Sequence, residues 1–404
     1  MISDRRPLIE LTTYQWCEPT ALNDEDIAYL RGESPQQINI VREVDSQAYR
    51  LNPNQYVGVL RLPSGVRIEC RPRVGVANIL YMLAVAYRMP SSFRHQLATF
   101  APFDQVIDAV ASYFADTVNE LVSRGLYRSY MERDENLPIV RGRIMFAEDA
   151  RLNFALRHRT YCRYSELTWD IPENQVLRQV AQALSNWPFR RREIPTRLAL
   201  IAGELSELSP SSLRVEDIDR FTYHRQNEYY RRSHALCRLF LETVSLSEHA
   251  GDVRFQTFLL DMNKLFESFV SQALEDRLEP SFRVGAQIPT SLDTRGAVRI
   301  QPDLLLSRGT EDLLVGDCKF KRLGEDEFKN HDHYQLLAYC TALGIDRGVL
   351  IYPLHEVAAT QEVDVRNSSI HLATLTVDIG GDVDYLEAEC DRLAGAMAAE
   401  ALRT

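Results

Sequence analysis

Three residues near the end of the sequence, Asp303, Asp317 and Lys319, have the types and spacing needed for metal-assisted phosphate chemistry. Asp303 follows Pro302 and precedes an apolar run, while Asp317 and Lys319 end a second apolar run. Because successive side chains of a strand alternate between its faces, Asp317 and Lys319 should point the same way. Two carboxylates can bind Mg²⁺, which activates a bound water, and a lysine can neutralise the charge that develops on a phosphate. The pattern predicts a metal-dependent site that cleaves phosphodiesters.

An acidic residue followed by acid-x-Lys also arises by chance, so the surroundings of the motif must decide. Residues 327–329 have the same spacing but open a predicted helix with no strand around them. Asp303 and Asp317, in contrast, both adjoin apolar strands, where an unpaired charge would be costly. Gln335 and Tyr339 then follow at a spacing that sets both polar groups on one helical face. We therefore favour a site over surface charges at strand ends, with Gln335 and Tyr339 supporting it; simple packing of Tyr339 between helix and sheet is the alternative.

The elements that must position these residues follow from the spacing of apolar residues. Between residue 251 and the end of the sequence, the order helix, three strands, helix, two strands, helix predicts a mixed sheet flanked by helices, an α/β core. The expected elements are a helix from Phe258, strands at Phe282–Ile288, Val298–Leu306 and Asp312–Phe320, a helix at Glu325–Leu343, strands at Gly348–Tyr352 and His371–Val377, and a helix at Tyr385–Leu402.

The rest of the chain reads as two further regions, so we expect a multidomain α+β protein. Residues 1–95 are β-rich, with a hairpin that turns at Pro63-Ser64-Gly65, and end in a helix at Val76–Tyr87. Residues 96–250 are mainly helical, with a short extended interruption at Arg141–Ile144 and a long helix expected at Asp219–Ser247. The predicted domains are therefore 1–95, 96–250 and 251–404, and the last, with its own sheet and helices, is expected to carry a separate core.

Composition restricts the class of protein. The 404 residues carry a net charge of −11, which opposes unaided binding to DNA. Positive charge is concentrated between Arg124 and Arg238, which hold 20 Arg and no Lys against 15 acidic residues. None of the four lysines of the chain follows a glycine-rich turn, so we expect no phosphate loop and no nucleotide bound by this chain. The absence of a signal sequence, of a membrane span and of CxxC pairs predicts a cytoplasmic protein with reduced cysteines.

These motifs resemble a known group of nucleases. PD at Pro302-Asp303, DxK at Asp317–Lys319 and QxxxY at Gln335–Tyr339 look like the PD-(D/E)xK superfamily of restriction enzymes and RecB-type exonucleases. The wider resemblance is to the McrC family, the cleavage subunits of McrBC modified-cytosine restriction systems. It is carried by Phe258–Val270, Leu137–Ile144, Cys162–Asp170 and Gly58–Pro63. The family often has a small residue such as Ala where Cys318 stands.

The resemblance implies a Mg²⁺-dependent endonuclease, with Mn²⁺ able to substitute, that resembles restriction endonucleases in its C-terminal core. It implies a partner, a hexameric McrB-like AAA+ GTPase that docks on the N-terminal region, reads modified cytosine in double-stranded DNA and is stimulated by this chain. Glu267 matches a carboxylate that such nucleases place near the metal; a solvated helix charge is its alternative. Lys321, on the strand face of Lys319, either contacts phosphate or faces solvent. Two other readings remain: a non-catalytic scaffold that activates the GTPase, and a stand-alone RecB-like repair nuclease.

Overall fold

The computed structural model describes residues 8–32, 37–44, 48–89, 104–155, 158–248, 254–320, 330–354 and 362–403. The chain divides into two compact units, one formed by Met1–Val106 with Thr243–Thr404 and the other by Ile107–Glu242. The expected multidomain α+β class is confirmed. The three-part division stays a prediction, although the structure groups the β-rich region with the C-terminal segment in one unit.

The N-terminal sheet draws strands from distant parts of the sequence. Its order is β1 (Leu8–Thr12), β6 (Arg67–Arg71), β5 (Tyr56–Arg61), β11 (Arg254–Asp261) and β10 (Val244–Glu248). The expected hairpin at Pro63-Ser64-Gly65 is confirmed by antiparallel β5 and β6. The expected helical start at Phe258 is wrong, because Phe258 lies in β11 and pairs with Val59 of β5. A cut at residue 250 would therefore remove an internal strand of this sheet.

Smaller elements complete this region. A second sheet is formed by β2 (Thr20–Ala21), β4 (Ala48–Asn52) and β3 (Asn39–Arg42). Helix α1 (Asp24–Gly32) lies between β2 and β3 in the chain and contributes Leu30 to the core. The buried cluster includes Leu11, Leu30, Leu60, Ile68 and Leu259. Since Leu259 belongs to β11, the core of the β-rich region needs a residue from the C-terminal part of the chain.

The sheet of the C-terminal segment is mixed, as predicted. Its order is β12 (Arg283–Ala286), β15 (Leu304–Arg308), β16 (Glu311–Cys318), β17 (Arg347–Pro353), β19 (His371–Val377) and β18 (Glu362–Asp364). Strands β15 and β16 are antiparallel, whereas β16, β17 and β19 run parallel. One expected strand, Val298–Leu306, is interrupted: β14 (Arg299–Ile300) pairs with β13 (Thr290–Ser291) as a separate hairpin before β15 begins.

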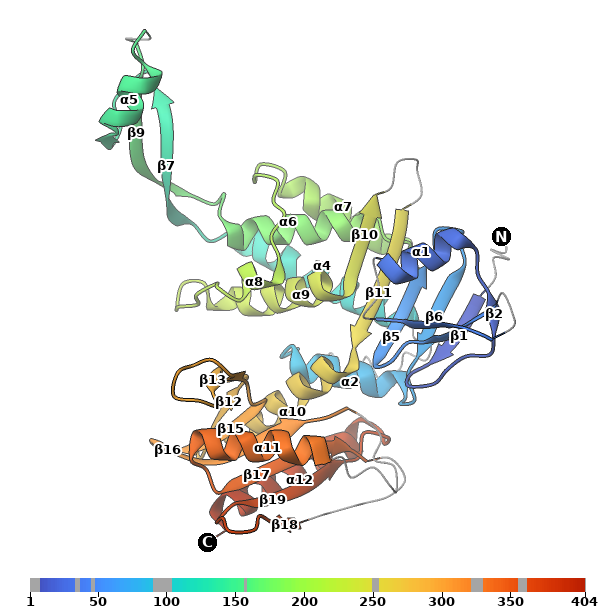
Figure 1. Ribbon diagram of the computed structural model, residues 1–404. Helices are drawn as coiled ribbons and strands as arrows, with labels where there is room; N and C mark the ends of the chain where they lie inside the picture. The colour runs from blue at the N-terminus through green and yellow to red at the C-terminus, as the bar shows by residue number, and fades with distance from the viewer. Residues whose placement is uncertain are drawn as a thin grey trace. The chain divides into compact units, whose positions relative to one another are not determined.

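Four helices accompany this sheet (Figure 1). Helix α11 (Asn330–Leu343) packs on the face that carries Val315, Leu350 and Tyr352. Helices α10 (Met262–Leu278) and α12 (Val383–Leu402) pack against each other and against the sheet. Helix α2 (Val76–Ala86), predicted correctly from its spacing, packs on α10. The expected start of α11 at Glu325 lies outside the described residues.

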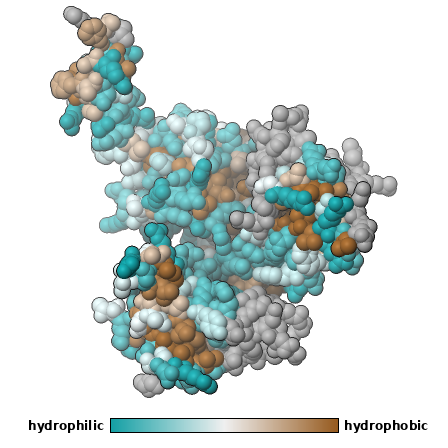
Figure 2. Space-filling model, viewed as in Figure 1, coloured by the Kyte–Doolittle hydropathy of each residue, from teal (hydrophilic) through white to brown (hydrophobic). Residues whose placement is uncertain are grey.

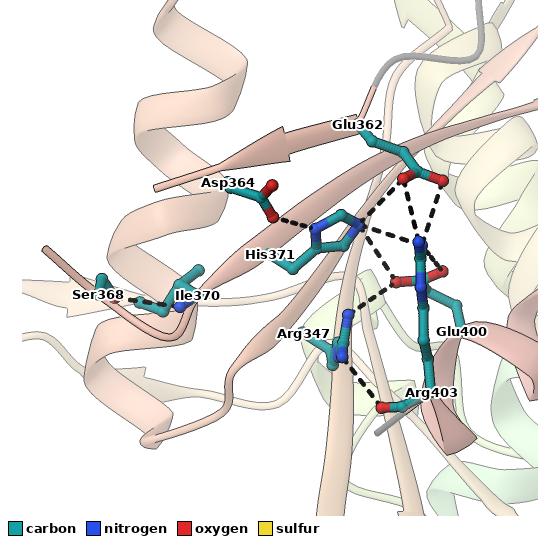
Figure 3. A network of polar contacts seen from close by, with 8 residues as sticks. All are labelled: Arg347, Glu362, Asp364, Ser368, Ile370, His371, Glu400 and Arg403. Atoms are coloured by element: carbon teal, nitrogen blue, oxygen red, sulfur yellow. Dashed lines mark hydrogen bonds and ion pairs between the residues drawn. The ribbon is translucent and has the colours of Figure 1, made fainter. Parts of the chain in front are cut away.

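The end of α12 is held to the sheet by a network of polar contacts around His371 of β19 (Figure 3). The His371 ring contacts Asp364 of β18 at 2.8 Å and Glu400 of α12 at 3.6 Å. Arg403 pairs with Glu362 of β18 at 3.1 Å. These contacts lie at the β18 edge of the sheet, four strands away from β15.

The second unit combines helices with a projecting arm. Its helices are α4 (Asp104–Arg124), α6 (Pro172–Ser185), α7 (Glu193–Glu204), α8 (Val215–Ile218) and α9 (Arg231–Thr243), with the 3-10 turn η1 (Glu228–Tyr230). The expected single helix at Asp219–Ser247 is therefore wrong: α9 covers only its middle, and its end forms β10. None of the described helices is long and apolar enough to cross a membrane.

The arm is built by β7 (Ser129–Leu137), β9 (Thr160–Thr168), β8 (Arg143–Ile144) and α5 (Phe146–Leu152). The extended residues expected near Arg141–Ile144 are confirmed as β8. Large apolar side chains are exposed on it, with Phe154 88% and Phe146 76% accessible. Figure 2 shows hydrophobic atoms gathered around α5 at the end of the arm.

Candidate active site

Strand pairing places the two predicted aspartates opposite each other. In the antiparallel β15–β16 pair, Leu304 faces Gly316 and Leu305 faces Val315, so the same register continued by one residue sets Asp303 opposite Asp317. Directly opposed residues have their Cβ atoms about 4.5–5.5 Å apart and lie on one face of the sheet. The backbone N–H of Cys318 donates to Asp303 Oδ2 at 2.8 Å, which fixes that carboxylate against β16.

Lys319 completes the predicted constellation. Its Nζ lies 2.8 Å from Asp317 Oδ2, with the Asp317 side chain 1% exposed and that of Lys319 24% exposed. The N–H of Lys319 donates to Ile351 O at 2.9 Å, so β17 fixes the backbone that carries the ammonium group. Asp303, Asp317 and Lys319 are thus brought together at one end of the sheet.

A third acid, Asp332, lies beside this group and was not among the predicted site residues. It is the third residue of α11, is 2% exposed, and accepts a hydrogen bond from the Tyr352 hydroxyl at 2.6 Å. The parallel register pairs Asp317 with Leu350, so Tyr352 falls two residues further along β17, next to Lys319 and on the same face. The sequence His331-Asp332-His333 does not show that Asp332 is buried, because this depends on which face of α11 packs on the sheet.

The predicted supporting residues Glu267, Gln335 and Tyr339 each form a side-chain hydrogen bond. Glu267 of α10 accepts from Gln287 Nε2 at 2.6 Å, and Gln287 N–H donates to Asp303 O at 3.2 Å. Gln335 Nε2 donates to the Tyr339 hydroxyl at 2.6 Å, which confirms that the two share a helical face. Gln287 was missed from the sequence because it lies in a turn with a φ of 48° that no apolar pattern marks.

The pKa values of Asp303, Asp317 and Lys319 are all shifted by burial and by one another. Burial, followed by the carboxylates of Asp317 and Glu267, raises the pKa of Asp303 to about 8. Burial also raises the pKa of Asp317, although Lys319 opposes this. Burial alone would lower the pKa of Lys319, but the attraction of Asp317 raises it instead. Negative charge is therefore concentrated where a cation would relieve it.

The donor set fits Mg²⁺ through two aspartates rather than through a closed cage. Among the residues that the structure describes, no three His, Cys, Asp or Glu side chains form a group that could hold a metal ion. Mg²⁺, however, usually keeps several waters and takes one or two carboxylates from the protein. Asp303 and Asp317 meet that requirement, while Glu267 is bonded to Gln287. Lys321 lies outside the described residues.

Comparison with known proteins decides the family. A family model described as "McrBC 5-methylcytosine restriction system component" matches residues 51–353, which include Asp303, Asp317, Lys319, Gln335 and Tyr339. The chain belongs to the McrBC family. The resemblance to the McrC family, stated from Phe258–Val270, Leu137–Ile144, Cys162–Asp170 and Gly58–Pro63, is thereby confirmed.

Individual relatives of the McrBC family agree with this assignment. The "Type IV methyl-directed restriction enzyme EcoKMcrBC" of Escherichia coli (strain K12) is 22% identical over 328 residues, 76% of this chain and 94% of that protein. A solved structure, the "half-complex from tetradecameric assembly of Thermococcus gammatolerans McrB AAA+ hexamers with bound McrC", has a chain with a TM-score of 0.54 and 18% identity. The match covers 96% of this chain and 100% of that chain, and it shows a shared fold.

Proposed function

We propose that this McrBC-family chain is the Mg²⁺-dependent DNA endonuclease subunit of its restriction system, with a restriction-endonuclease-like core in its C-terminal segment. The observation that carries the proposal is the pairing of Asp303 with Asp317 across β15 and β16, with Lys319 Nζ 2.8 Å from Asp317. A pair of acids, with Asp317 buried and Asp303 partly buried, is costly for folding, so its presence beside a lysine at a sheet end favours a functional role over a structural one.

Each residue has a distinct part in the proposed reaction. Asp303 and Asp317 would hold Mg²⁺, and Mn²⁺ would substitute for it because it also prefers oxygen ligands. When bound, the cation supplies an activated water and neutralises charge on the scissile phosphate. Lys319 stabilises the negative charge that develops on that phosphate. Glu267 adds negative charge near the cation, and the Gln335–Tyr339 pair lies on the helix that covers the site.

The proposed partner is a hexameric AAA+ GTPase that this chain stimulates. In support, the related solved structure is described as McrB AAA+ hexamers with bound McrC. The net charge of −11 and the lack of a lysine after a glycine-rich turn also favour a chain that depends on another protein to supply GTP hydrolysis and to hold DNA. We propose that this partner selects double-stranded DNA containing modified cytosine.

The test is DNA cleavage by the chain with its AAA+ partner, comparing the natural protein with Asp317→Asn. We expect cleavage to fall by several orders of magnitude while GTPase stimulation is retained, because only the cation site is altered. Asp312→Asn is the matched control, since Asp312 lies at the other end of the same hairpin and bonds Ser307. If Asp317→Asn still cuts DNA, the site is wrong; if neither form cuts but both stimulate GTP hydrolysis, the chain is a scaffold.

A further inference from the structure

The hairpin β13–β14 extends directly from the candidate site. Thr290 pairs with Ile300 and Ser291 with Arg299, and Leu292 N–H donates to Val298 O at 2.8 Å. Figure 1 shows this hairpin beyond the end of β12. Its second strand leads into Asp303 only four residues after Arg299, so the two Cα atoms are at most roughly 14 Å apart. A ligand held at Asp303 would therefore lie within reach of the hairpin.

The base of the hairpin is tied to site residues. Gln301 Nε2 donates to Gln287 O at 3.3 Å, and Gln287 itself bonds Glu267 through its side chain and Asp303 through its backbone. The two ends of the hairpin are thus fixed to each other and to two acids of the site. Movement of the hairpin base is coupled to the position of these acids.

The tip of the hairpin has a defined turn. Asp293 accepts hydrogen bonds from the N–H groups of Val298 at 2.8 Å and Arg295 at 3.1 Å, and these bonds lower the pKa of its carboxyl. Gly296 adopts a φ of 71°, which other residues rarely adopt. The charge of Asp293 is directed at the backbone of its own turn, which leaves the arginines of the hairpin to face outward.

The hairpin presents positive charge without partners. Arg295 and Arg299 are exposed, and neither guanidinium makes an ion pair or a hydrogen bond with any of the residues that the structure describes. Four other arginines of the same sheet and its helices are neutralised, Arg277 by Glu387, Arg347 by Glu400, Arg392 by Glu389 and Arg403 by Glu362. Arg283 and Arg308 are also exposed, but they lie on β12 and β15 rather than on the hairpin. What distinguishes Arg295 and Arg299 is their position: both lie on a hairpin whose base is bonded to residues of the acidic site, where their positive charge is available to an anionic ligand.

We propose that the β13–β14 hairpin binds duplex DNA, with Arg295 and Arg299 contacting backbone phosphates a few nucleotides from the bond that is cut. The proposal rests on the proposed nuclease function and identifies how this chain itself contacts its substrate. DNA phosphates recur about every 3.4 Å along a strand, so several lie within the distance between the hairpin and Asp303. Phosphate contacts of this kind position the duplex without reading its sequence, which leaves base selection to the partner.

The experiment measures binding of a fluorescent DNA duplex to the full chain in the Asp317→Asn background, so that cleavage does not interfere. Each phosphate contact contributes about 0.9 to the slope of log affinity against log salt. Arg295→Ala with Arg299→Ala should therefore lower the slope by about 1.8. Between about 50 and 200 mM salt, the unsubstituted background should lose roughly 12-fold more affinity than this double variant. A photocrosslinking residue in place of the exposed Ala297 should also attach to the duplex.

The matched control removes the same charge elsewhere. Arg308→Ala with Arg366→Ala takes two exposed arginines from the far end of the β15–β16 hairpin and from the β18–β19 turn, and it should leave the slope unchanged. Equal slopes for the two double variants, or no crosslink at position 297, would overturn the proposal. So would loss of binding to the AAA+ partner with DNA binding intact, because the hairpin would then contact protein.

The same design separates the hairpin from the nuclease site. If the hairpin crosslinks DNA and sets the salt slope but the natural chain with its partner never cuts, the proposed function fails and the DNA contact stands. If the natural chain cuts and the Arg295→Ala, Arg299→Ala form cuts with unchanged KM and salt slope, the nuclease stands and the hairpin proposal fails.

Discussion

Replacing Asp303 by Asn should abolish cleavage and, without metal, make the protein more stable. Asp303 is partly buried, lies opposite Asp317, and accepts one backbone hydrogen bond from Cys318 that an Asn oxygen can still accept. It forms no ion pair with Lys319 in the described structure, since that lysine contacts Asp317 instead. The substitution therefore removes a carboxyl group whose charged form is disfavoured by burial and by Asp317, and it leaves the other contacts in place.

The size of the effect follows from the pKa of Asp303. Burial and neighbouring acids raise this pKa from its ordinary value of 3.8 to about 8. The folded state thus keeps a proton that the unfolded state releases, so the metal-free stability falls as the pH rises between these two values. At about 1.36 kcal/mol for each pH unit, the cost at pH 7 is at most roughly 4 kcal/mol. Allowing for partial exposure to solvent, we expect Asp303→Asn to gain about 1–4 kcal/mol at pH 7 and almost nothing near pH 4.

Thermal unfolding in EDTA, and hydrogen exchange of the β15–β16 amides, measure this gain. The transition of the unit that contains the site should rise by roughly 2–8 °C at pH 7. Mg²⁺ should stabilise the natural chain, by about 2.7 kcal/mol at 100 times its dissociation constant, and should not stabilise Asp303→Asn. Asp312→Asn, the same change at the far end of the hairpin, should show neither effect. A metal-free Asp303→Asn protein that is less stable than the natural one at pH 7 would refute the argument that the two aspartates repel each other.

Three further outcomes are expected. Lys319→Ala should lose cleavage, and Lys319→Arg should be nearly as poor because a planar guanidinium does not reproduce the position of an ammonium; a fully active Lys319→Arg in a cleavage assay would contradict this. Asp332→Asn should lower kcat at least tenfold with little change in the Mg²⁺ concentration that gives half-maximal rate, since Asp332 lies beside Lys319 rather than in the aspartate pair. Tyr352→Phe should also lower kcat, but by less. A changed Mg²⁺ requirement in either variant would argue against this placement of Asp332. A fragment of residues 1–250 should be much less stable than one ending at 261, measured by circular dichroism and proteolysis, because it lacks β11; equal resistance of the two would show that this strand is dispensable.

Much of the candidate site could be predicted because it depends on local patterns. The alternation in strands set Asp317 and Lys319 on one face, and the four-residue helical spacing set Gln335 with Tyr339, and both relations are observed. The strand at His371–Val377 was predicted with its observed bounds, since it is a mostly buried run between turn residues. Both kinds of prediction needed only neighbours in the sequence.

The parts that sequence reasoning missed depend on contacts between distant residues. Phe258 fits the apolar spacing of the helix that follows it, but in the structure it belongs to β11 and pairs with Val59 of β5. Burial alternates along strands β7 and β9 of the arm, but the less exposed face of β7 carries polar and charged residues such as Arg133 and Glu135, so its sequence shows no apolar alternation. Pro302, which lacks a backbone N–H, follows the end of β14, where the single expected strand Val298–Leu306 is broken.

The place of β11 inside the N-terminal sheet has a consequence for synthesis of the chain on the ribosome. Tyr56 of β5 pairs with Asp261 of β11, so β5 emerges on the order of 200 residues before the strand that completes its sheet. At about 5–20 residues per second, the edge of β5 stays unpaired for roughly 10–40 seconds. An unpaired edge can pair with strands of other chains. The nascent chain therefore exposes this edge to pairing with other chains until residue 261 has left the ribosome.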